Sequence, residues 1–148
     1  METIIAKIKH KDDAAALEAA QIEADNQKIY DKAGKILRDG GLVAFPTETV
    51  YGLDSKASAK IYAAKGRPSD NPLIVHIADI QALYKLSTEV NDNALRLAGK
   101  FWPGPLTMIL KKSDIVPETI TGGLGTVAIR MPSHPVAAKL IKDSGVYI

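Results

Sequence analysis

Short apolar runs that end at proline or glycine alternate with segments of helical periodicity, and this alternation is what most constrains the fold. Residues 42–45 are an uninterrupted apolar run closed by Pro46, which predicts a strand buried on both faces. Just before this run, apolar residues recur between Ile29 and Leu37 at the spacing of one helix face, and the glycines at 40–41 offer a stop. Helices that alternate with buried strands are typical of an α/β domain with a mixed sheet.

The same alternation continues along the chain, and at 3–8 a period-two pattern predicts an edge strand. Residues 146–148 start another apolar run without a turn or a polar tail, so we expect a sheet that is incomplete at its C-terminal end and a chain that is a fragment. We expect one domain over 1–148, with an N-terminal extension of about 27 residues. Further strands are expected at 73–77, 106–110 and 126–131, and helices at 61–64, 80–86, 93–101 and 135–142.

Composition excludes several classes of protein. Hydrophobic residues make up 46% of the 148 residues and charged residues 24%, which is typical of a folded globular chain. The formal charge is only +2, so any affinity for polyanions has to be local. There is no cysteine, which excludes disulfides and thiolate catalysis, and no apolar run is long enough to span a bilayer. We expect a cytoplasmic protein that does not bind membranes.

Three catalytic signatures are absent from the sequence: the Walker phosphate loop, the Gly-x-Ser-x-Gly elbow and the His-Glu-x-x-His metal helix. Residues 123–128 superficially match a dinucleotide-binding fingerprint. That motif has to follow a strand and open a helix, whereas this segment opens a strand, so we reject it.

Two cations flank a predicted helix end. Lys65 and Arg67 on either side of Gly66 are compatible with an ordinary helix C-terminus, where basic residues and glycine are favoured. The loop that follows, 68–72, contains two prolines and Asn71, and a rigid polar loop beside an arginine can present donors to a phosphate. Together these residues indicate an anion site.

Two polar residues fall within apolar strands. His76 lies in the predicted strand 73–77, where a lone histidine is more often a core residue than a ligand. Arg130 ends the apolar run 127–129, and a charge on a buried strand needs a partner, either an internal carboxylate or a ligand.

Two further segments contain prolines. The hydroxyls at 47–49 follow a buried strand at the edge where α/β sheets place ligands, although a proline-initiated turn accounts for them equally well. Residues 102–105 predict a rigid corner between helix and strand, with the indole of Trp102 in the core.

Four segments in this order resemble the threonylcarbamoyl-AMP synthase family, whose domain is called YrdC, and the similarity runs from about residue 29 to the end. The resemblance implies a twisted α/β sheet around a basic cavity. It implies synthesis of threonylcarbamoyl-AMP from ATP, L-threonine and bicarbonate with release of pyrophosphate, the first step of threonylcarbamoyladenosine formation in tRNA. The segments are LVAFPTETVYGL (42–53), KGRPSDNPLIVH (65–76), FWPGPLT (101–107) and TVAIRMP (126–132).

The resemblance also implies roles for individual residues. ATP would be bound with Mg²⁺, and the resemblance implies no metal site made by protein side chains. Expected partners are tRNA, bound weakly, and the tRNA threonylcarbamoyltransferase proteins that use the product. By this resemblance Lys65 and Arg67 are catalytic, Lys65, Arg67, Asn71 and Thr126 bind ATP, and Thr49, His76 and Arg130 bind threonine.

Two departures from the family's pattern leave other functions open. The segment between Leu53 and Ile61 is shorter than in the family, and the family continues beyond the end of this chain into residues that complete the ATP site. The alternatives are therefore an inactive fragment, a non-catalytic module that binds nucleotide or RNA, and the carbamoyl-adenylate domain of a larger carbamoyltransferase.

Overall fold

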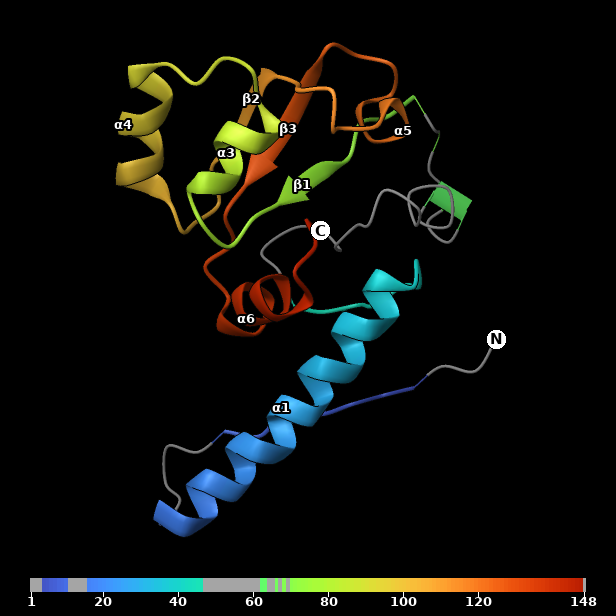
Figure 1. Ribbon diagram of the computed structural model, residues 1–148, viewed down its shortest axis with the longest axis vertical. Coiled ribbons are helices and arrows are strands. Elements are labelled where there is room, and N and C mark those ends of the chain that lie inside the picture. Colours follow the sequence, from blue (N-terminus) through green and yellow to red (C-terminus); the bar gives the residue numbers. More distant parts are fainter. Residues whose placement is uncertain are drawn as a thin grey trace.

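The computed structural model describes residues 4–10, 16–46, 62–63, 66, 68 and 70–147. The three strands form one mixed sheet of order β1-β3-β2, in which β3 runs parallel to β1 and antiparallel to β2 (Figure 1). The helices and strands are, in chain order, α1 (Ala16–Arg38), β1 (Ile74–His76), α3 (Gln81–Leu86), α4 (Asp92–Phe101), β2 (Thr107–Lys111), α5 (Glu118–Thr121), β3 (Thr126–Arg130) and α6 (Pro135–Ser144).

Local sequence sets where the longer helices begin. The side chain of Asn91 caps α4 by accepting a hydrogen bond of 2.9 Å from the amide of Ala94. At α6 the ring of His134 accepts from the amide of Val136 at 3.3 Å, and Pro135 occupies the first helical position, where its missing N–H costs nothing. These caps satisfy backbone donors that the helix itself leaves unpaired.

The two faces of the sheet have different surroundings. Because side chains alternate along a strand, the register assigns each residue to one face. One face is apolar and buried, and it packs in the main core together with the buried residues of α3 and α4. The other face carries the three predicted site residues that lie in the described strands, which are His76, Thr126 and Arg130. Its members are Ile74 and His76 of β1, Thr107, Ile109 and Lys111 of β2, and Thr126, Ala128 and Arg130 of β3.

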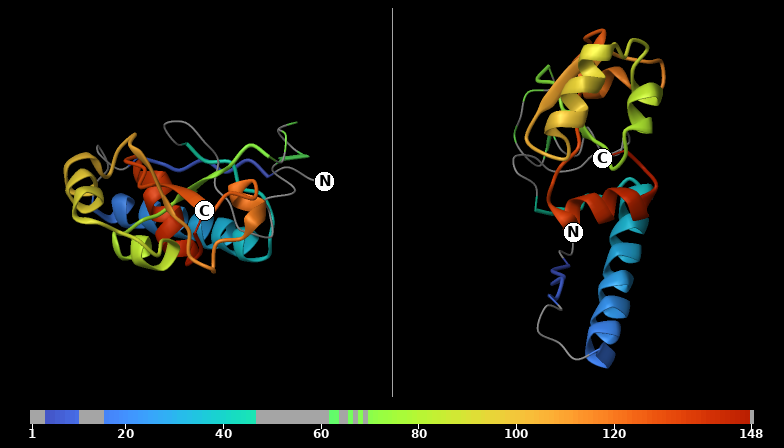
Figure 2. Two further views of the ribbon diagram at one scale, coloured as in Figure 1. Left: turned by 90° about the horizontal axis from the view of Figure 1, so that it is seen from above. Right: turned by 90° about the vertical axis from the view of Figure 1, so that its left-hand side faces the viewer.

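Helices α1 and α6 form a second apolar cluster. Tyr30 and Leu37 of α1 pack with Leu140 and Ile141 of α6, and the Nζ of Lys139 lies 5.1 Å from the centre of the Tyr30 ring. Figures 1 and 2 show α6 between the sheet and α1, with the N-terminal half of α1 extending away from the sheet and α6. None of the helices that the structure describes is long and apolar enough to cross a membrane.

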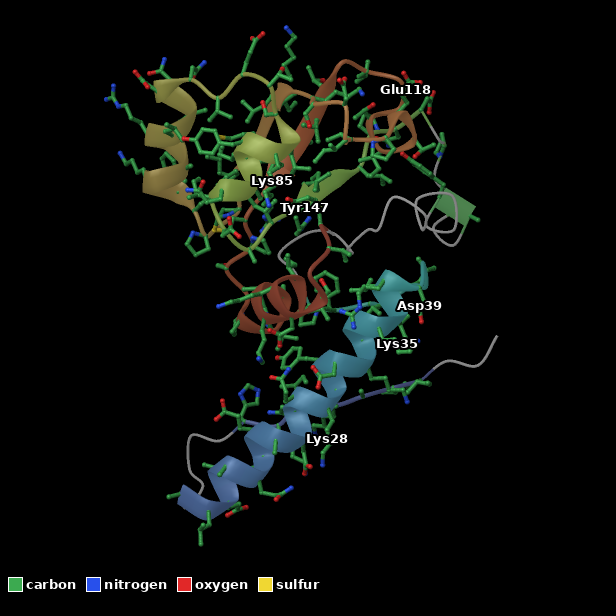
Figure 3. All side chains as sticks on the ribbon, in the orientation of Figure 1. Lys28, Lys35, Asp39, Lys85, Glu118 and Tyr147 are labelled. Carbon is green, nitrogen blue, oxygen red and sulfur yellow. The ribbon has the colours of Figure 1, made fainter. Side chains whose placement is uncertain are left out.

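The exposed surface of α1 is charged. The side chains of Lys28, Lys35 and Asp39, labelled in Figure 3, are exposed, and Lys35 and Asp39 pair with 2.5 Å between Nζ and Oδ2. Exposed pairs of this kind contribute little to the stability of a helix.

Most of the predicted elements are confirmed, and three predicted strands are wrong. Residues 4–8 and 42–45 form no strand, and neither do 146–147. An extended segment becomes a strand only when another strand takes up its backbone groups. Directly after the first of these segments, the amide and the carbonyl of Lys9 bond to the side chain of Asn26 and not to another strand, at 3.0 and 2.9 Å. Residues 42–45 still contribute Phe45, which is buried in the second cluster.

Candidate functional site

The predicted site residues fall into two groups. The side chains of Thr49, Lys65 and Arg67 lie outside the described residues. Asn71, His76, Thr126 and Arg130 are described, and they lie on or beside two neighbouring parallel strands.

His76 and Arg130 are direct neighbours. They are the last residues of β1 and β3, and the parallel register pairs them. Both therefore project from the same face of the sheet at the carboxyl ends of parallel strands, where open α/β sheets bind ligands. Both are buried, with exposures of 0% and 1%. A buried guanidinium beside a buried imidazole is costly unless something compensates for the lost water.

The imidazole of His76 is held as a hydrogen-bond acceptor. Its Nδ1 lies 3.3 Å from the carbonyl oxygen of Ile74, and because a carbonyl only accepts, Nδ1 has to carry the proton. The other ring nitrogen, Nε2, is buried and has no hydrogen-bond partner among the described residues. Burial lowers the pKa of His76 to about 4; the Ile74 carbonyl opposes this shift and the charge of Arg130 adds to it. His76 is therefore neutral at physiological pH, with a lone pair on Nε2.

Arg130 is held by the backbone of the corner between α4 and β2. Its Nε donates a buried hydrogen bond of 3.0 Å to the carbonyl oxygen of Gly104. The amide of Gly104 in turn donates to the carbonyl of Met131 at 2.8 Å. Gly104 is a functional candidate that the sequence analysis missed, because nothing in residues 102–105 indicates that a backbone carbonyl there meets Arg130.

The corner itself confirms the prediction made from its prolines. The Trp102–Pro103 peptide bond is cis, and the half-buried indole of Trp102 packs against the main core. Its Nε1 donates a hydrogen bond of 2.7 Å to the carbonyl of Leu106. Hydrogen bonds thus hold the corner together internally and also connect it to the end of β3.

Asn71 and Thr126 lie at the opposite end of the sheet. Thr126 begins β3, so it shares a face with Arg130 but lies about 13 Å away along the strand. The register aligns the segment before β1 with the start of β3, which brings the exposed Asn71 to the same end as Thr126. The carbonyl of Asn71 accepts a hydrogen bond of 3.0 Å from the hydroxyl of Tyr62, which fixes the backbone of this loop.

This arrangement places two kinds of polar side chain at opposite ends of the sheet. At one end a buried cation and a neutral acceptor lie together, which suits a carboxylate next to a hydrogen-bond donor. At the other end are an amide and a hydroxyl. Within the described ranges, no group of three or more His, Cys, Asp or Glu side chains is placed to hold a metal ion. The class that the described residues define is an α/β domain with a mixed sheet and flanking helices.

Comparison with known proteins identifies the family. The model of the Sua5/YciO/YrdC family, described as "Telomere recombination", matches residues 35–148. The chain therefore belongs to this family. It is 57% identical over 122 residues to the threonylcarbamoyl-AMP synthase of Pyrococcus abyssi, covering 79% of this chain and 36% of that protein. The threonylcarbamoyl-AMP synthase of Bacillus subtilis is 54% identical over 129 residues, with 83% and 37% covered.

Solved structures agree with this assignment. Sua5 of P. abyssi, crystallised with L-threonine, superposes with a TM-score of 0.76 at 54% identity, covering 80% of this chain and 36% of that chain. YciO of E. coli superposes with a TM-score of 0.71 at 29% identity, covering 82% and 61%. The α/β fold with a mixed sheet and flanking helices is thus confirmed. The chain spans little more than a third of the two synthases named above.

Proposed function

We propose that this chain carries the substrate-binding face of a threonylcarbamoyl-AMP synthase. In that reaction the amine of L-threonine takes up the carbon of bicarbonate with loss of water, giving an N-carboxylate. One carboxylate oxygen then attacks the α-phosphorus of ATP, and the bond to the β-phosphate oxygen breaks with release of pyrophosphate. The product is threonylcarbamoyl-AMP, for later transfer to tRNA.

The observation that carries this proposal is the buried pair of His76 and Arg130 at the carboxyl ends of β1 and β3. Arg130 supplies the charge for the carboxylate of threonine, through charge-assisted hydrogen bonds. His76 accepts a hydrogen bond at Nε2 from a donor of the same amino acid. Thr49 completes the threonine site. A donor on such a ligand would give the buried Nε2 of His76 the hydrogen bond that it lacks among the described residues.

The nucleotide lies at the other end of the same face. Asn71 and Thr126 contact ATP there, and Lys65 and Arg67 neutralise its phosphates. Mg²⁺ binds together with those phosphates, as is usual for an ion that keeps much of its water shell. The separation of Thr126 from Arg130 along β3 supports this division, because it keeps the contacts proposed for the two substrates about 13 Å apart.

Catalysis in this proposal is positional. Transfer to the α-phosphorus needs the attacking and leaving oxygens in line and cations on the phosphates, and it needs no covalent intermediate with the protein. His76 does not act as a proton donor, because burial keeps it neutral. The protein is cytoplasmic, binds tRNA weakly, and passes its product to tRNA threonylcarbamoyltransferase proteins.

The test is release of pyrophosphate from ATP that depends on both L-threonine and bicarbonate. It is run on this chain, with the P. abyssi synthase as positive control. Threonine- and bicarbonate-dependent release supports the proposal, and its loss in Arg130→Lys ties the activity to the site. Binding of ATP or RNA without any release favours a non-catalytic binding module instead. Absence of binding and release in an otherwise folded chain favours an inactive fragment.

A further inference from the structure

The corner between α4 and β2 makes two hydrogen bonds through the backbone of a single residue, one with the last residue of β3 and one with the residue that follows it. Gly104 donates its amide to the carbonyl of Met131 at 2.8 Å and accepts the Nε–H of Arg130 at 3.0 Å. Gly104 is buried, and Arg130 is 1% exposed. The two bonds go to consecutive residues, so the position of Gly104 fixes both the backbone and the guanidinium at this end of the strand.

The fit at Gly104 leaves no room for a side chain. A Cβ atom built there would meet the carbonyl oxygen of Phe101, at the end of α4, well inside van der Waals contact. The obstacle is backbone and not the end of a flexible side chain, so the corner itself would have to move. The corner cannot move easily, because the amide and the indole of Trp102 hold it through hydrogen bonds of 2.9 and 2.7 Å.

The bond to Gly104 also determines which part of the guanidinium can meet an anion. Arginine can grip a carboxylate through its two Nη groups or through Nε and one Nη, because its five N–H donors lie in one plane. Here Nε–H is directed at the Gly104 carbonyl, so a carboxylate has to be met by the Nη groups. A guanidinium already fixed in its plane also loses less conformational entropy when it binds.

We propose that Gly104 is a positioning residue for the substrate carboxylate: its carbonyl oxygen orients Arg130 so that the Nη groups bind the α-carboxylate of the amino acid. This inference rests on the proposed function and adds a residue to it. Gly104 touches no substrate and acts only through Arg130.

The first test compares Gly104→Ala with Gly99→Ala by calorimetry, using L-threonine and L-threoninamide, which lacks the carboxylate. Gly99 is an exposed residue of α4, and a Cβ there meets nothing within 4 Å, so it is the matched control. We expect Gly104→Ala to lower the ratio of the affinity for L-threonine to the affinity for L-threoninamide by about tenfold. This is the effect expected when one charge-assisted hydrogen bond is displaced. Gly99→Ala should leave the ratio at its wild-type value. Partial unfolding would lower the affinities for both ligands equally and would not change their ratio.

The second test needs no glycine variant and uses the wild-type chain. The Nε–H signal of Arg130 is assigned in ¹⁵N spectra by its loss in Arg130→Lys. We expect this proton to exchange slowly with water, and to stay protected when L-threonine is added while the Nη signals shift. Rapid exchange of Nε–H, or an unchanged affinity ratio in folded Gly104→Ala, overturns the inference. If the wild-type chain does not prefer L-threonine to L-threoninamide, the proposed threonine site itself is wrong.

Discussion

Replacing His76 by leucine should remove a specific part of the acid sensitivity of this protein. The pKa of His76 is lowered by burial from 6.5 to about 4 in the folded chain. Between these two values the unfolded chain binds a proton at this position and the folded chain does not. The free energy of unfolding therefore falls as the pH falls from about 6.5 towards 4.

The magnitude follows from the size of the pKa difference. Within that window each pH unit removes up to about 1.4 kcal/mol of stability. Between about pH 7 and pH 5 this one group accounts for about 2 kcal/mol of lost stability. The full value applies, because the His76 side chain is 0% exposed and water does not screen it. Leucine has a similar size and does not titrate, so His76→Leu should lose this contribution.

The assay is urea unfolding of the wild type and of His76→Leu at both pH values. The expected result is that the wild type loses about 2 kcal/mol more than the variant on acidification. Carboxylates that titrate over the same range are common to both proteins and cancel in the difference. His10→Gln, which removes an exposed histidine and keeps His76, serves as control and should behave as the wild type. Equal losses in wild type and His76→Leu would refute the reasoning.

Two further predictions concern the corner and the turn before β3. Trp102→Phe removes the bond from the indole to the carbonyl of Leu106 and should lower the free energy of unfolding by about 1 kcal/mol in urea; an unchanged midpoint would contradict the importance of that bond. Gly122 and Gly123 have φ angles of +60° and +82°, but only at Gly122 would a Cβ meet a neighbour, the carbonyl oxygen of Asp70 at 2.7 Å. Gly122→Ala should therefore be less stable than Gly123→Ala by at least about 1 kcal/mol, and equal stabilities would show that the loop yields without cost.

Local periodicity predicted the helices and strands well where glycine or proline marks their ends in the sequence. The three observed strands begin and end within a residue or two of the predicted ones, because glycines and prolines flank the apolar runs. The helix α5 was missed, since four residues are too short for a periodic pattern. The strand expected at 42–45 failed for a different reason: an apolar run predicts burial, but a strand also needs a partner. The division into one domain and an N-terminal extension stays a prediction.

The site was predictable in its residues but not in its geometry. A charged Arg130 at the end of an apolar run already required a partner, and the structure places it beside His76 through the parallel register. The sequence could not show that Nε2 of His76 is buried without a partner among the described residues, since that depends on packing from several elements. Nor could it show the bond from Arg130 to Gly104, because backbone carbonyls carry no sequence signal.

The most direct test of the central claim is a titration of the ¹⁵N-histidine-labelled chain with L-threonine, followed at the imidazole nitrogens of His76. If this face holds the amino acid, the Nε2 signal should shift saturably towards that of a hydrogen-bonded acceptor while Nδ1 keeps its proton. The shift should be lost or greatly weakened in Arg130→Lys. Saturable binding of L-threonine that leaves the His76 signals unchanged, or no binding at all, would contradict the account.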